Sequence, residues 1–198
     1  MLIKYENLTI RSATVADAEQ LCLWWNDGRV MAHAGFPNGV GCIPEEIRES
    51  LSKDTDETHR RHIIELDGKP IGEMNYRNKD GSHAGAVQKP LAIGCAEIGI
   101  KICDFAEQEK GYGTELLTVF IDALFRCYGY EKIVLDTNLK NKRAQHVYEK
   151  KLGFRNLGIE KDAWRDQLGE LQSAVNYELD KTDWLASQEE PLEYYHSR

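Results

Sequence analysis

The hydrophobic residues of this chain alternate with polar residues in some segments and recur at a helical spacing in others. Alternation and short apolar runs predict strands at 8–11, 61–66, 70–76, 92–102, 132–137, 154–162 and 170–179. Helix-start signals and apolar stripes predict helices over 14–25, from 44 onward, over 114–128 and over 141–153. Strands mixed with helices in this way indicate an α/β or α+β sheet that is covered on its faces.

Turn residues mark the boundaries of these elements. Asp67-Gly68 separates two predicted strands and is typical of a two-residue hairpin turn. Gly129 is suited to the left-handed end of the helix before it. The segment 78–90 is a long loop, and loops of that length commonly serve a function. Because no repeat or linker interrupts the chain, we expect a single domain over 1–182 and a C-terminal tail over 183–198.

Composition limits the partners that the chain can have. The 198 residues include 25 Lys and Arg and 33 Asp and Glu, a net charge of -8. That sign disfavours nucleic acid and favours a cationic molecule, although acidic surfaces also serve solubility. No apolar run is long enough to span a membrane and no signal peptide opens the chain, so we expect a cytoplasmic protein. Its five cysteines are scattered, which indicates neither disulfides nor a metal site.

The segment 108–114 carries the clearest chemical signal, because it follows a predicted strand and begins a predicted helix. Gly111 and Gly113 allow the backbone to approach a ligand closely, and the N–H groups at the start of a helix favour an anion. Lys110 adds a positive charge. The segment therefore predicts a diphosphate cradle. Leu116 stands where a dinucleotide-binding turn has its third glycine, and the Walker pattern is absent, which disfavours NAD enzymes and nucleotide hydrolases.

A second segment, 141–154, carries Ala144, Val147 and Tyr148 on one helical face, with Asn141 placed to cap the helix. Taken alone, it indicates only a packed tyrosine. A strand with Glu97-Ile98-Gly99-Ile100, then Gln-x-x-Gly-x-Gly, then Asn-x-x-Ala-x-x-x-Tyr-x-x-x-x-Gly-Phe, however, resembles the GNAT superfamily of N-acetyltransferases.

The motifs of this resemblance cover 93–154. Two further segments are similar to one branch of this superfamily, which holds ribosomal-protein alanine acetyltransferases and aminoglycoside 6′-N-acetyltransferases. These segments are Trp24-Trp25-Asn26-Asp27 and Leu135-Asp136-Thr137-Asn138. The resemblance implies a mixed, mostly antiparallel, twisted sheet of about six or seven strands with about four flanking helices. It also implies a V-shaped splay between the two central strands.

The resemblance further implies that acetyl-coenzyme A (acetyl-CoA) is the acetyl donor. Its pyrophosphate would lie on the glycine-rich turn and its pantetheine arm along the splayed strand. A backbone N–H of that strand would polarise the thioester carbonyl. The implied cofactor-binding residues are Ile100, Lys101, Ile102, Gln108, Lys110, Gly111, Tyr112, Gly113, Thr114 and Asn141.

For catalysis, the resemblance implies that Tyr148 protonates the departing thiolate. A protonated amine cannot attack, so a group must accept its proton. Asp136 and Glu97 are alternative bases, and a water relay is a third route. Cys95 and Cys103 are near this region, but no partnering histidine is indicated, and we therefore expect direct transfer in a ternary complex.

The acceptor would contact Trp24, Trp25, Asp27 and Trp164, although two adjacent helical tryptophans cannot both face it. Aromatic and acidic residues suit a cationic small molecule such as an aminoglycoside or a polyamine. A protein N-terminus is the alternative acceptor, and a non-catalytic CoA-binding or interaction module of the same fold is an alternative class. We expect a monomer or a homodimer, with no metal, nucleic acid or membrane partner.

Overall fold

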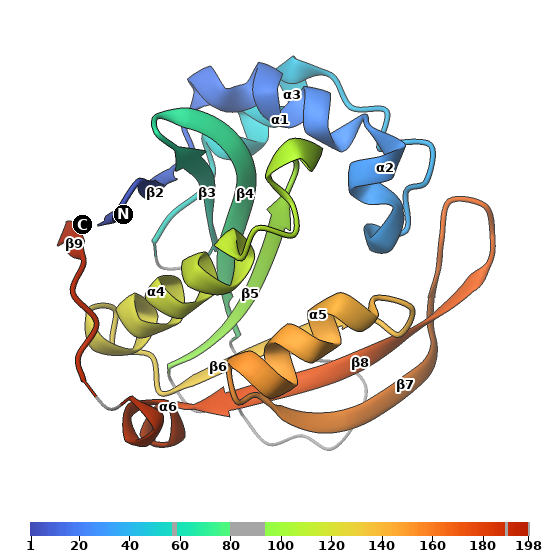
Figure 1. Cartoon of the computed structure of the whole chain (residues 1–198). Coiled ribbons are helices and arrows are strands. Elements are labelled where there is room, and N and C mark those ends of the chain that lie inside the picture. Colours follow the sequence, from blue (N-terminus) through green and yellow to red (C-terminus); the bar gives the residue numbers. More distant parts are fainter. Residues whose placement is uncertain (57–58, 80–93, 189, 198) are drawn as a thin grey trace.

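The computed structural model describes residues 1–56, 59–79, 94–188 and 190–197. Within these residues, nine strands form one twisted sheet in the order β7-β8-β6-β5-β4-β3-β2-β1-β9 (Figure 1). All neighbouring pairs are antiparallel except β5 and β6. The strands are β1 (Leu2–Tyr5), β2 (Leu8–Ser12), β3 (His59–Leu66), β4 (Lys69–Asn78), β5 (Cys95–Ile102), β6 (Lys132–Asn138), β7 (Arg155–Arg165), β8 (Leu171–Asp180) and β9 (Tyr195–Ser197).

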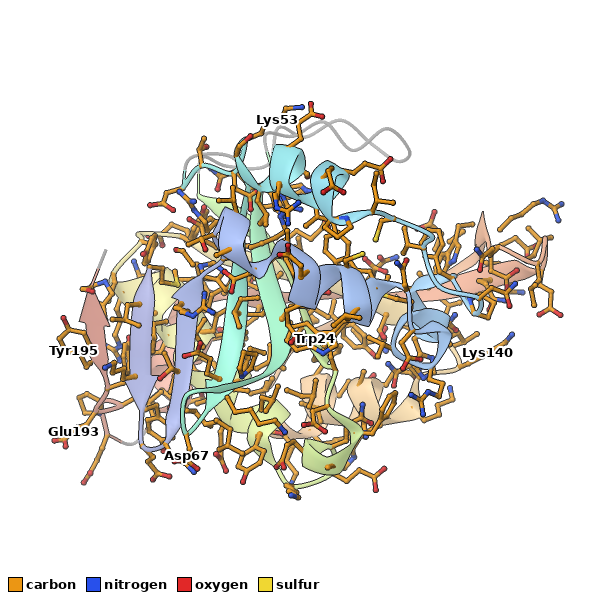
Figure 2. All side chains as sticks on the ribbon, turned by 90° about the horizontal axis from the view of Figure 1, so that it is seen from above. Trp24, Lys53, Asp67, Lys140, Glu193 and Tyr195 are labelled. Carbon is orange, nitrogen blue, oxygen red and sulfur yellow. The ribbon has the colours of Figure 1, made fainter. Side chains whose placement is uncertain are left out.

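Helices cover both faces of the sheet. Figure 2 shows α1, α2 and α3 lying across one face, and α4 packs on the other, as Figure 1 shows. The α-helices are α1 (Ala18–Trp25), α2 (Gly28–Met31), α3 (Pro44–Leu51), α4 (Tyr112–Arg126), α5 (Lys142–His146) and α6 (Lys181–Ser187). Shorter turns are the 3-10 turns η1 (Val15–Asp17), η2 (Ala32–Ala34) and η3 (Phe105–Glu107) and the π-helical turn η4 (Val147–Lys151).

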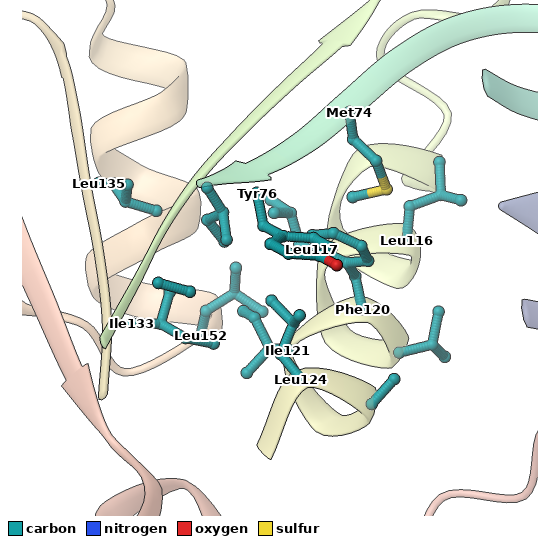
Figure 3. Close-up of a cluster of buried hydrophobic side chains, with 14 of the residues drawn as sticks. Met74, Tyr76, Leu116, Leu117, Phe120, Ile121, Leu124, Ile133, Leu135 and Leu152 are labelled. Carbon is teal, nitrogen blue, oxygen red and sulfur yellow. The ribbon is translucent and has the colours of Figure 1, made fainter. Parts of the chain in front are cut away.

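The core forms on both faces of the sheet because successive strand residues point to opposite sides. Ile63 and Ile64 of β3 are both fully buried, Ile63 against the α1–α3 side and Ile64 against the α4 side. On the α4 side, Tyr76 of β4 lies against Leu117 and Phe120 (Figure 3). Burying a large apolar side chain stabilises the fold by about 1.5–3 kcal/mol, so this face holds the sheet and α4 as one unit.

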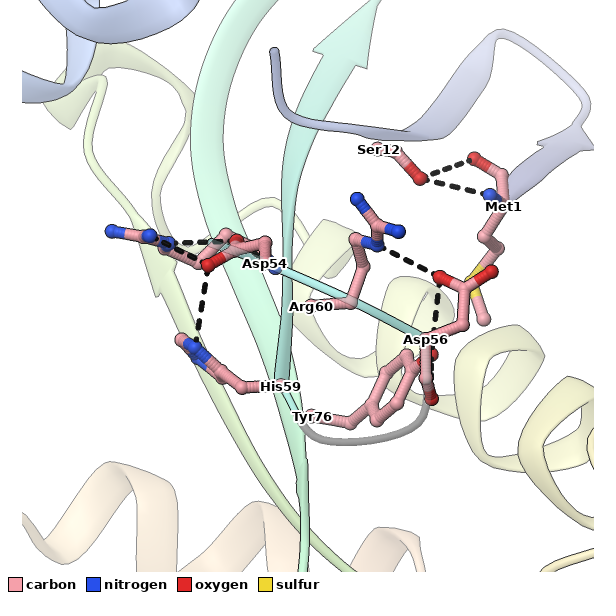
Figure 4. Close-up of polar contacts among 8 residues, drawn as sticks. Met1, Ser12, Asp54, Asp56, His59, Arg60 and Tyr76 are labelled. Atoms are coloured by element: carbon pink, nitrogen blue, oxygen red, sulfur yellow. Dashed lines mark hydrogen bonds and ion pairs between the residues drawn. The ribbon is translucent and has the colours of Figure 1, made fainter. Parts of the chain in front are cut away.

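The start of β3 is fixed by charged groups at the edge of this core. Asp54 accepts hydrogen bonds from the guanidinium and the backbone N–H of Arg61, and Asp56 accepts one from Arg60 (Figure 4). Burial opposes the ionisation of Asp54, but its bonds to Arg61 hold the pKa of its carboxyl below the usual value. These pairs fix where β3 enters the sheet.

The central strands separate, as expected. β5 and β6 pair over Cys95↔Lys132, Ala96↔Ile133 and Glu97↔Val134. β5 continues to Ile102 along β4 with an unbroken register, while β6 turns away to follow β8. Every later residue of β5 therefore has a strand on one side and an opening on the other, which is the predicted V-shaped splay.

Most of the predicted elements are confirmed. The hairpin at Asp67-Gly68 has φ of 50° and 78°, the left-handed pair that a type I′ turn requires. The mixed, mostly antiparallel sheet is also confirmed, although the described residues form nine strands where six or seven were expected, and six α-helices where about four were expected. The loop predicted at 78–90 lies outside the described residues beyond Lys79. The helix predicted over 141–153 is an α-helical turn followed by the π-helical turn η4.

The segment predicted as a tail contributes α6 and the edge strand β9, where Tyr195 lies beside β1 (Figure 2). Asp122 of α4, which is 1% exposed, anchors this segment. Its carboxylate accepts hydrogen bonds from Trp184 Nε1 at 3.1 Å, Tyr194 Oη at 3.0 Å and Arg126 Nε at 2.9 Å. One buried carboxylate therefore binds the C-terminal segment to the main core.

Asp122→Ala should lower the free energy of unfolding by about 3 kcal/mol, because it leaves a buried indole N–H and a partly buried phenol without their acceptor. Urea unfolding followed by tryptophan fluorescence measures this loss. The control is Asp183→Ala, which removes an exposed carboxylate from α6. Equal stabilities for the two variants would contradict the anchoring role of Asp122.

Candidate active site

A cavity of about 1050 Å³ lies where β5 and β6 separate. Its walls are residues 98–102 of β5, residues 136–138 of β6, the turn 107–114 before and into α4, and the beginning of α5. The predicted cofactor-binding residues all line it except Lys110. The cavity continues under α2 and η2 and reaches Trp164 of β7.

The edge of β5 presents backbone groups to this cavity. Cys103 N–H donates to Ile71 O at 2.8 Å, and Cys95 O accepts from Lys79 N–H at 3.0 Å, so residues 95 and 103 are directed toward β4. Along an antiparallel pair, each second residue has both backbone groups on the same side. The backbone groups of Ile98, Ile100 and Ile102 therefore face the cavity. Gln108 Nε2 donates to the Ile102 carbonyl at 2.8 Å. The Ile102 N–H lies on the same side of the strand and is directed into the cavity.

The glycine-rich turn has the geometry of an anion cradle. Gly111 caps α4 with φ of 97°, a left-handed conformation that favours glycine. Its carbonyl accepts hydrogen bonds from Thr114 N–H at 2.9 Å and Glu115 N–H at 3.3 Å. A Cβ on Gly113 would meet no atom within 4 Å, so the space beside that residue is open. As at the start of any helix, the first N–H groups of this 15-residue helix have no acceptor one turn back and can donate to an anion.

The cations around the cradle come mainly from α5. Lys110 forms an ion pair with Glu107 at 2.9 Å and does not line the cavity. Lys142 and Arg143 do line it, and Arg143 Nη1 lies 3.4 Å from Glu109 Oε1 across the opening. Neither residue was predicted from the sequence. They directly follow the N-cap Asn141, and their place in the first turn of a helix predicted to flank the cofactor was the available signal.

Tyr148 and Asp136 both line the cavity, and the charge of Asp136 acts on the Tyr148 hydroxyl. Tyr148 is 8% exposed and packs edge-on against Tyr177, with ring centroids 5.6 Å apart. Burial, and then the negative charge of Asp136, raise the pKa of Tyr148 to about 12. Asp136 is exposed to the cavity. This arrangement pairs a phenol that stays protonated with a carboxylate that can accept a proton.

Glu97 and the two nearby cysteines do not line this cavity. Glu97 forms an ion pair with Lys79. Cys95 and Cys103 are buried, and burial raises the pKa of the Cys95 thiol to about 11 and that of Cys103 further. A thiol with a raised pKa is a poor nucleophile, so the structure offers no activated cysteine at this site.

The four residues predicted to contact the acceptor have different positions. Trp164 lines the cavity, whereas Trp24 is 9% exposed and packs in the core beneath α1 (Figure 2). Trp25 Nε1 donates to Glu73 Oε1 at 2.9 Å, and the same oxygen lies 3.1 Å from Lys101 Nζ.

Asp27 likewise holds a cation that lines the cavity. It caps α2 and pairs with Arg29 at 2.6 Å, and the Arg29 guanidinium lies 4.7 Å from the ring centre of Phe105. Trp25, through Glu73, therefore orients Lys101, and Asp27 orients Arg29. Both cations line the cavity, whereas Trp25 and Asp27 do not. Arg29 and His33 both line the cavity, and neither was predicted from the sequence.

The residues that the structure describes also bear on metal binding and on membrane crossing. No group of three or more His, Cys, Asp or Glu side chains among them could hold a metal ion. None of the helices they form has the length and apolar composition needed to cross a membrane.

Comparison with known proteins agrees with this geometry. The family model for the acetyltransferase (GNAT) domain matches residues 7–155. The chain therefore belongs to the GNAT acetyltransferase family, as the motifs predicted.

Individual relatives are more distant. The aminoglycoside N(6′)-acetyltransferase type 1 of Klebsiella pneumoniae is 27% identical over 154 residues, which cover 77% of this chain and 76% of that protein. Its counterpart from Serratia marcescens matches equally.

Solved structures share the fold. Spermidine N-acetyltransferase from Vibrio cholerae, in complex with CoA and spermine, has a TM-score of 0.76 and 23% identity, and covers 91% of this chain and 99% of its own. Aminoglycoside acetyltransferase AAC(6′)-Ib, in complex with CoA and kanamycin, has a TM-score of 0.73 and 24% identity, and covers 91% and 98%.

Gly113→Glu should weaken acetyl-CoA binding at least about 10-fold, because it places a carboxylate in the open space beside the helix N-terminus, where an anion is expected. Isothermal titration calorimetry measures the dissociation constant. Gly113→Ala is the matched control, because its Cβ meets no neighbouring atom and the position has no left-handed φ. Unchanged affinity in Gly113→Glu would contradict the cradle assignment.

Proposed function

We propose that this protein is an N-acetyltransferase that transfers the acetyl group of acetyl-CoA to a primary amine of a cationic small molecule. One observation carries the proposal: the unpaired edge of β5, the glycine cradle and the hydroxyl-bearing side chain of Tyr148 all open on the same cavity. Membership of the GNAT acetyltransferase family supports it.

The residues present fit a nucleotide-linked thioester. The first N–H groups of α4 and the side chains of Lys142 and Arg143 would hold the pyrophosphate. The inward backbone groups of Ile98 and Ile100 would hydrogen-bond the amides of the pantetheine arm, as an added strand does. When bound there, acetyl-CoA supplies an acetyl group activated as a thioester.

Residues of this chain would then polarise the thioester carbonyl and transfer the protons. The Ile102 N–H would polarise the thioester carbonyl, which would make its carbon more susceptible to attack. Asp136 accepts a proton from the acceptor ammonium, directly or through water, and so frees the nitrogen lone pair. As the N–C bond forms and the C–S bond breaks, the Tyr148 hydroxyl would donate its proton to the sulfur. The second proton that the nitrogen loses would return to the phenolate, directly or through water, which leaves the N-acetyl amide and the free CoA thiol. Glu97 is the weaker candidate for the base, because Lys79 already engages its carboxylate.

The chemical class of the acceptor is inferred from residues that line the cavity and from the net charge of the chain. The Asp136 carboxylate faces the cavity, the Trp164 ring lines it, and the chain carries a net charge of -8, which together favour a cationic amine. The names of the relatives support the same class, since they include enzymes for aminoglycosides and spermidine. A protein N-terminus is the second candidate acceptor, and a non-catalytic CoA-binding module is the second candidate class.

We further propose a cytoplasmic location, because all five cysteines are free and a reducing compartment keeps them so. We also propose that the protein is a monomer or a homodimer.

A thiol-release assay tests the proposed function. Acetyl-CoA is incubated with spermidine, with kanamycin and with peptides that carry a free N-terminal alanine or serine. We expect turnover with the polycationic amines. Turnover with the peptides alone would favour protein N-terminal acetylation, and tight CoA binding without turnover would favour the non-catalytic module.

Tyr148→Phe should lower kcat about 100-fold and leave the affinity for acetyl-CoA nearly unchanged, because it removes one proton donor and little volume. Steady-state kinetics and calorimetry separate the two effects. Tyr177→Phe is the control, since the Tyr177 hydroxyl donates to Glu149 and does not line the cavity. Full activity of Tyr148→Phe would mean that another group protonates the thiolate.

The raised pKa of Tyr148 also predicts the pH dependence of kcat. A pKa of about 12 keeps the phenol protonated throughout the neutral and mildly alkaline range. The wild-type kcat should therefore show no alkaline decline from this group up to the ordinary tyrosine pKa of about 10. A decline below that pH that Tyr148→Phe abolishes would contradict the assigned protonation state.

A further inference from the structure

Two cysteines lie against each other where α1 meets the segment before α3. Cys22 of α1 is 9% exposed, and Cys42 is half-buried. The Cys22 thiol donates to the Cys42 carbonyl oxygen, with an Sγ–O distance of 3.3 Å. Burial, the charge of Cys22 and a hydrogen bond to its thiol, in that order, raise the pKa of the Cys42 thiol. The two thiols are therefore free but interact directly.

The side chain of Asn26, one helical turn after Cys22, fixes the backbone around this pair. Its Oδ1 accepts from the backbone N–H groups of Gly41 at 2.8 Å and Cys42 at 3.0 Å. Its Nδ2 donates to the Cys42 carbonyl at 2.9 Å. Nδ2 also lies 3.4 Å from Cys22 Sγ, and Oδ1 lies 3.5 Å from Cys42 Sγ. Both sulfurs are thus held beside one amide group, the close approach that a disulfide requires.

The segment 36–42 also contacts the backbone at the end of α1. Val40 N–H donates to Trp25 O at 2.8 Å. Gly39 has φ of 79°, and a Cβ there would overlap the Asn26 carbonyl oxygen, so a side chain at this position would push the two segments apart. The two parts of the chain that carry the cysteines therefore meet at backbone contact.

The chain between the two cysteines forms one wall of the active-site cavity. Residues 23–41 include α2 and η2, and four of them line the cavity: Arg29, Val30, His33 and Ala34. None of the predicted cofactor-binding residues lies in this range. A bond between the two sulfurs would close the chain into a loop that contains this whole wall.

Small molecules can reach the pair from solvent. Cys42 is partly exposed. A surface hollow of about 470 Å³ gives access to the other thiol, and it is lined by Cys22, Leu23, Asn26, Asp27 and Gly28. Both thiols are therefore open to exchange with a small disulfide.

We propose that Cys22 and Cys42 form a reversible disulfide by exchange with a small disulfide such as oxidised glutathione, and that this bond restrains the wall formed by α2 and η2. First, the thiolate of one cysteine attacks a sulfur of the small disulfide, which forms a mixed disulfide and releases one thiolate. The thiolate of the other cysteine then attacks the protein sulfur of the mixed disulfide and releases the second.

The exchange balances without a further reactant. Each cysteine thiol loses one proton, each released thiolate gains one, and two electrons pass from the cysteine pair to the small disulfide. An excess of reduced glutathione reverses both steps, so a reducing compartment keeps the two thiols free. Because the pKa of the Cys42 thiol is raised, its thiolate is scarce at neutral pH, and the exchange should accelerate as the pH rises.

Peptide mapping of the whole protein tests the bond. Trypsin cleaves after Arg11, Arg29 and Arg48, and so separates the two cysteines into peptides 12–29 and 30–48. The protein is incubated with equal amounts of reduced and oxidised glutathione, and the remaining thiols are then alkylated. We expect the two peptides to be linked in most of the protein, and dithiothreitol to separate them. Glutathione adducts alone, links to other cysteines or no oxidation would overturn the proposal.

Variants test whether the pair is held in place for this bond. Asn26→Ala keeps both thiols but removes the amide beside them, so half-oxidation should require at least about 10-fold more oxidised glutathione. Cys127→Ala is the matched control, because it removes another half-buried cysteine and should leave the link unchanged. Cys42→Ala keeps the backbone bonds to Asn26 and should carry only a glutathione adduct on Cys22. Equal midpoints for Asn26→Ala and the wild type would overturn the role of the amide.

Hydrogen exchange measures the restraint on the wall. The Val30 and Met31 N–H groups donate to Asp27 O at 3.0 and 3.1 Å. These amides should exchange at least about 3-fold more slowly in the oxidised protein than in the reduced protein. The Tm should rise by at least about 5 °C, because the closed loop lowers the entropy of the unfolded chain. Cys42→Ala, treated in the same way, should show neither change.

Equal exchange and equal Tm in the oxidised and reduced wild type would overturn the restraint, even where the linked peptides are found. None of these readouts depends on turnover. The N-acetyltransferase assignment and the disulfide can therefore fail independently of each other.

Discussion

The separation of β5 from β6 after three paired residues is the constraint on which the rest of the site depends. A strand that loses its neighbour leaves backbone N–H and C=O groups that need partners, and burying them unpaired is costly. The fold supports this edge from its other side, through an unbroken register with β4 and the packing of β4 on α4. It satisfies one exposed carbonyl internally, that of Ile102, with Gln108. The remaining groups form a ready-made hydrogen-bonding edge for an extended ligand.

The two faces of the sheet contribute different kinds of residue to the surroundings of this opening. The α4 side supplies rigidity, because its core is apolar and includes Tyr76, Leu117 and Phe120. The α1–α2 side supplies charge, and there Glu73 and Asp27 each hold a cation that lines the cavity. Glu73 is 4% exposed, and a buried carboxylate of this kind fixes its partners more firmly than a surface ion pair does. The part of the cavity wall beneath α1 and α2 is consequently built from oriented ion pairs, whereas the β5 edge is built from backbone groups.

Local signals were sufficient for much of this structure. Asp67-Gly68 specifies its hairpin by backbone conformation alone, and Gly111 specifies the cradle because its position requires a positive φ. Features that depend on distant partners were beyond the sequence. Gln167 is one polar residue in a turn until the fold brings it to Gly35 and Asn38. Likewise, the pattern could state that Trp24 and Trp25 face different ways, but only packing decides which is buried in the core.

The π-helical turn η4 has a consequence for how this active site can vary. The bond from Leu152 N–H to Val147 O spans five residues where an α-helix spans four, so the turn contains one residue more than an α-helical path would. One helical residue corresponds to a rotation of about 100° about the helix axis. Deleting a single residue here would turn the chain after η4 away from its present packing while leaving the Asn141 cap and the cradle contacts in place. The length of the chain at this turn therefore sets the surroundings of Tyr148 independently of the glycine-rich turn.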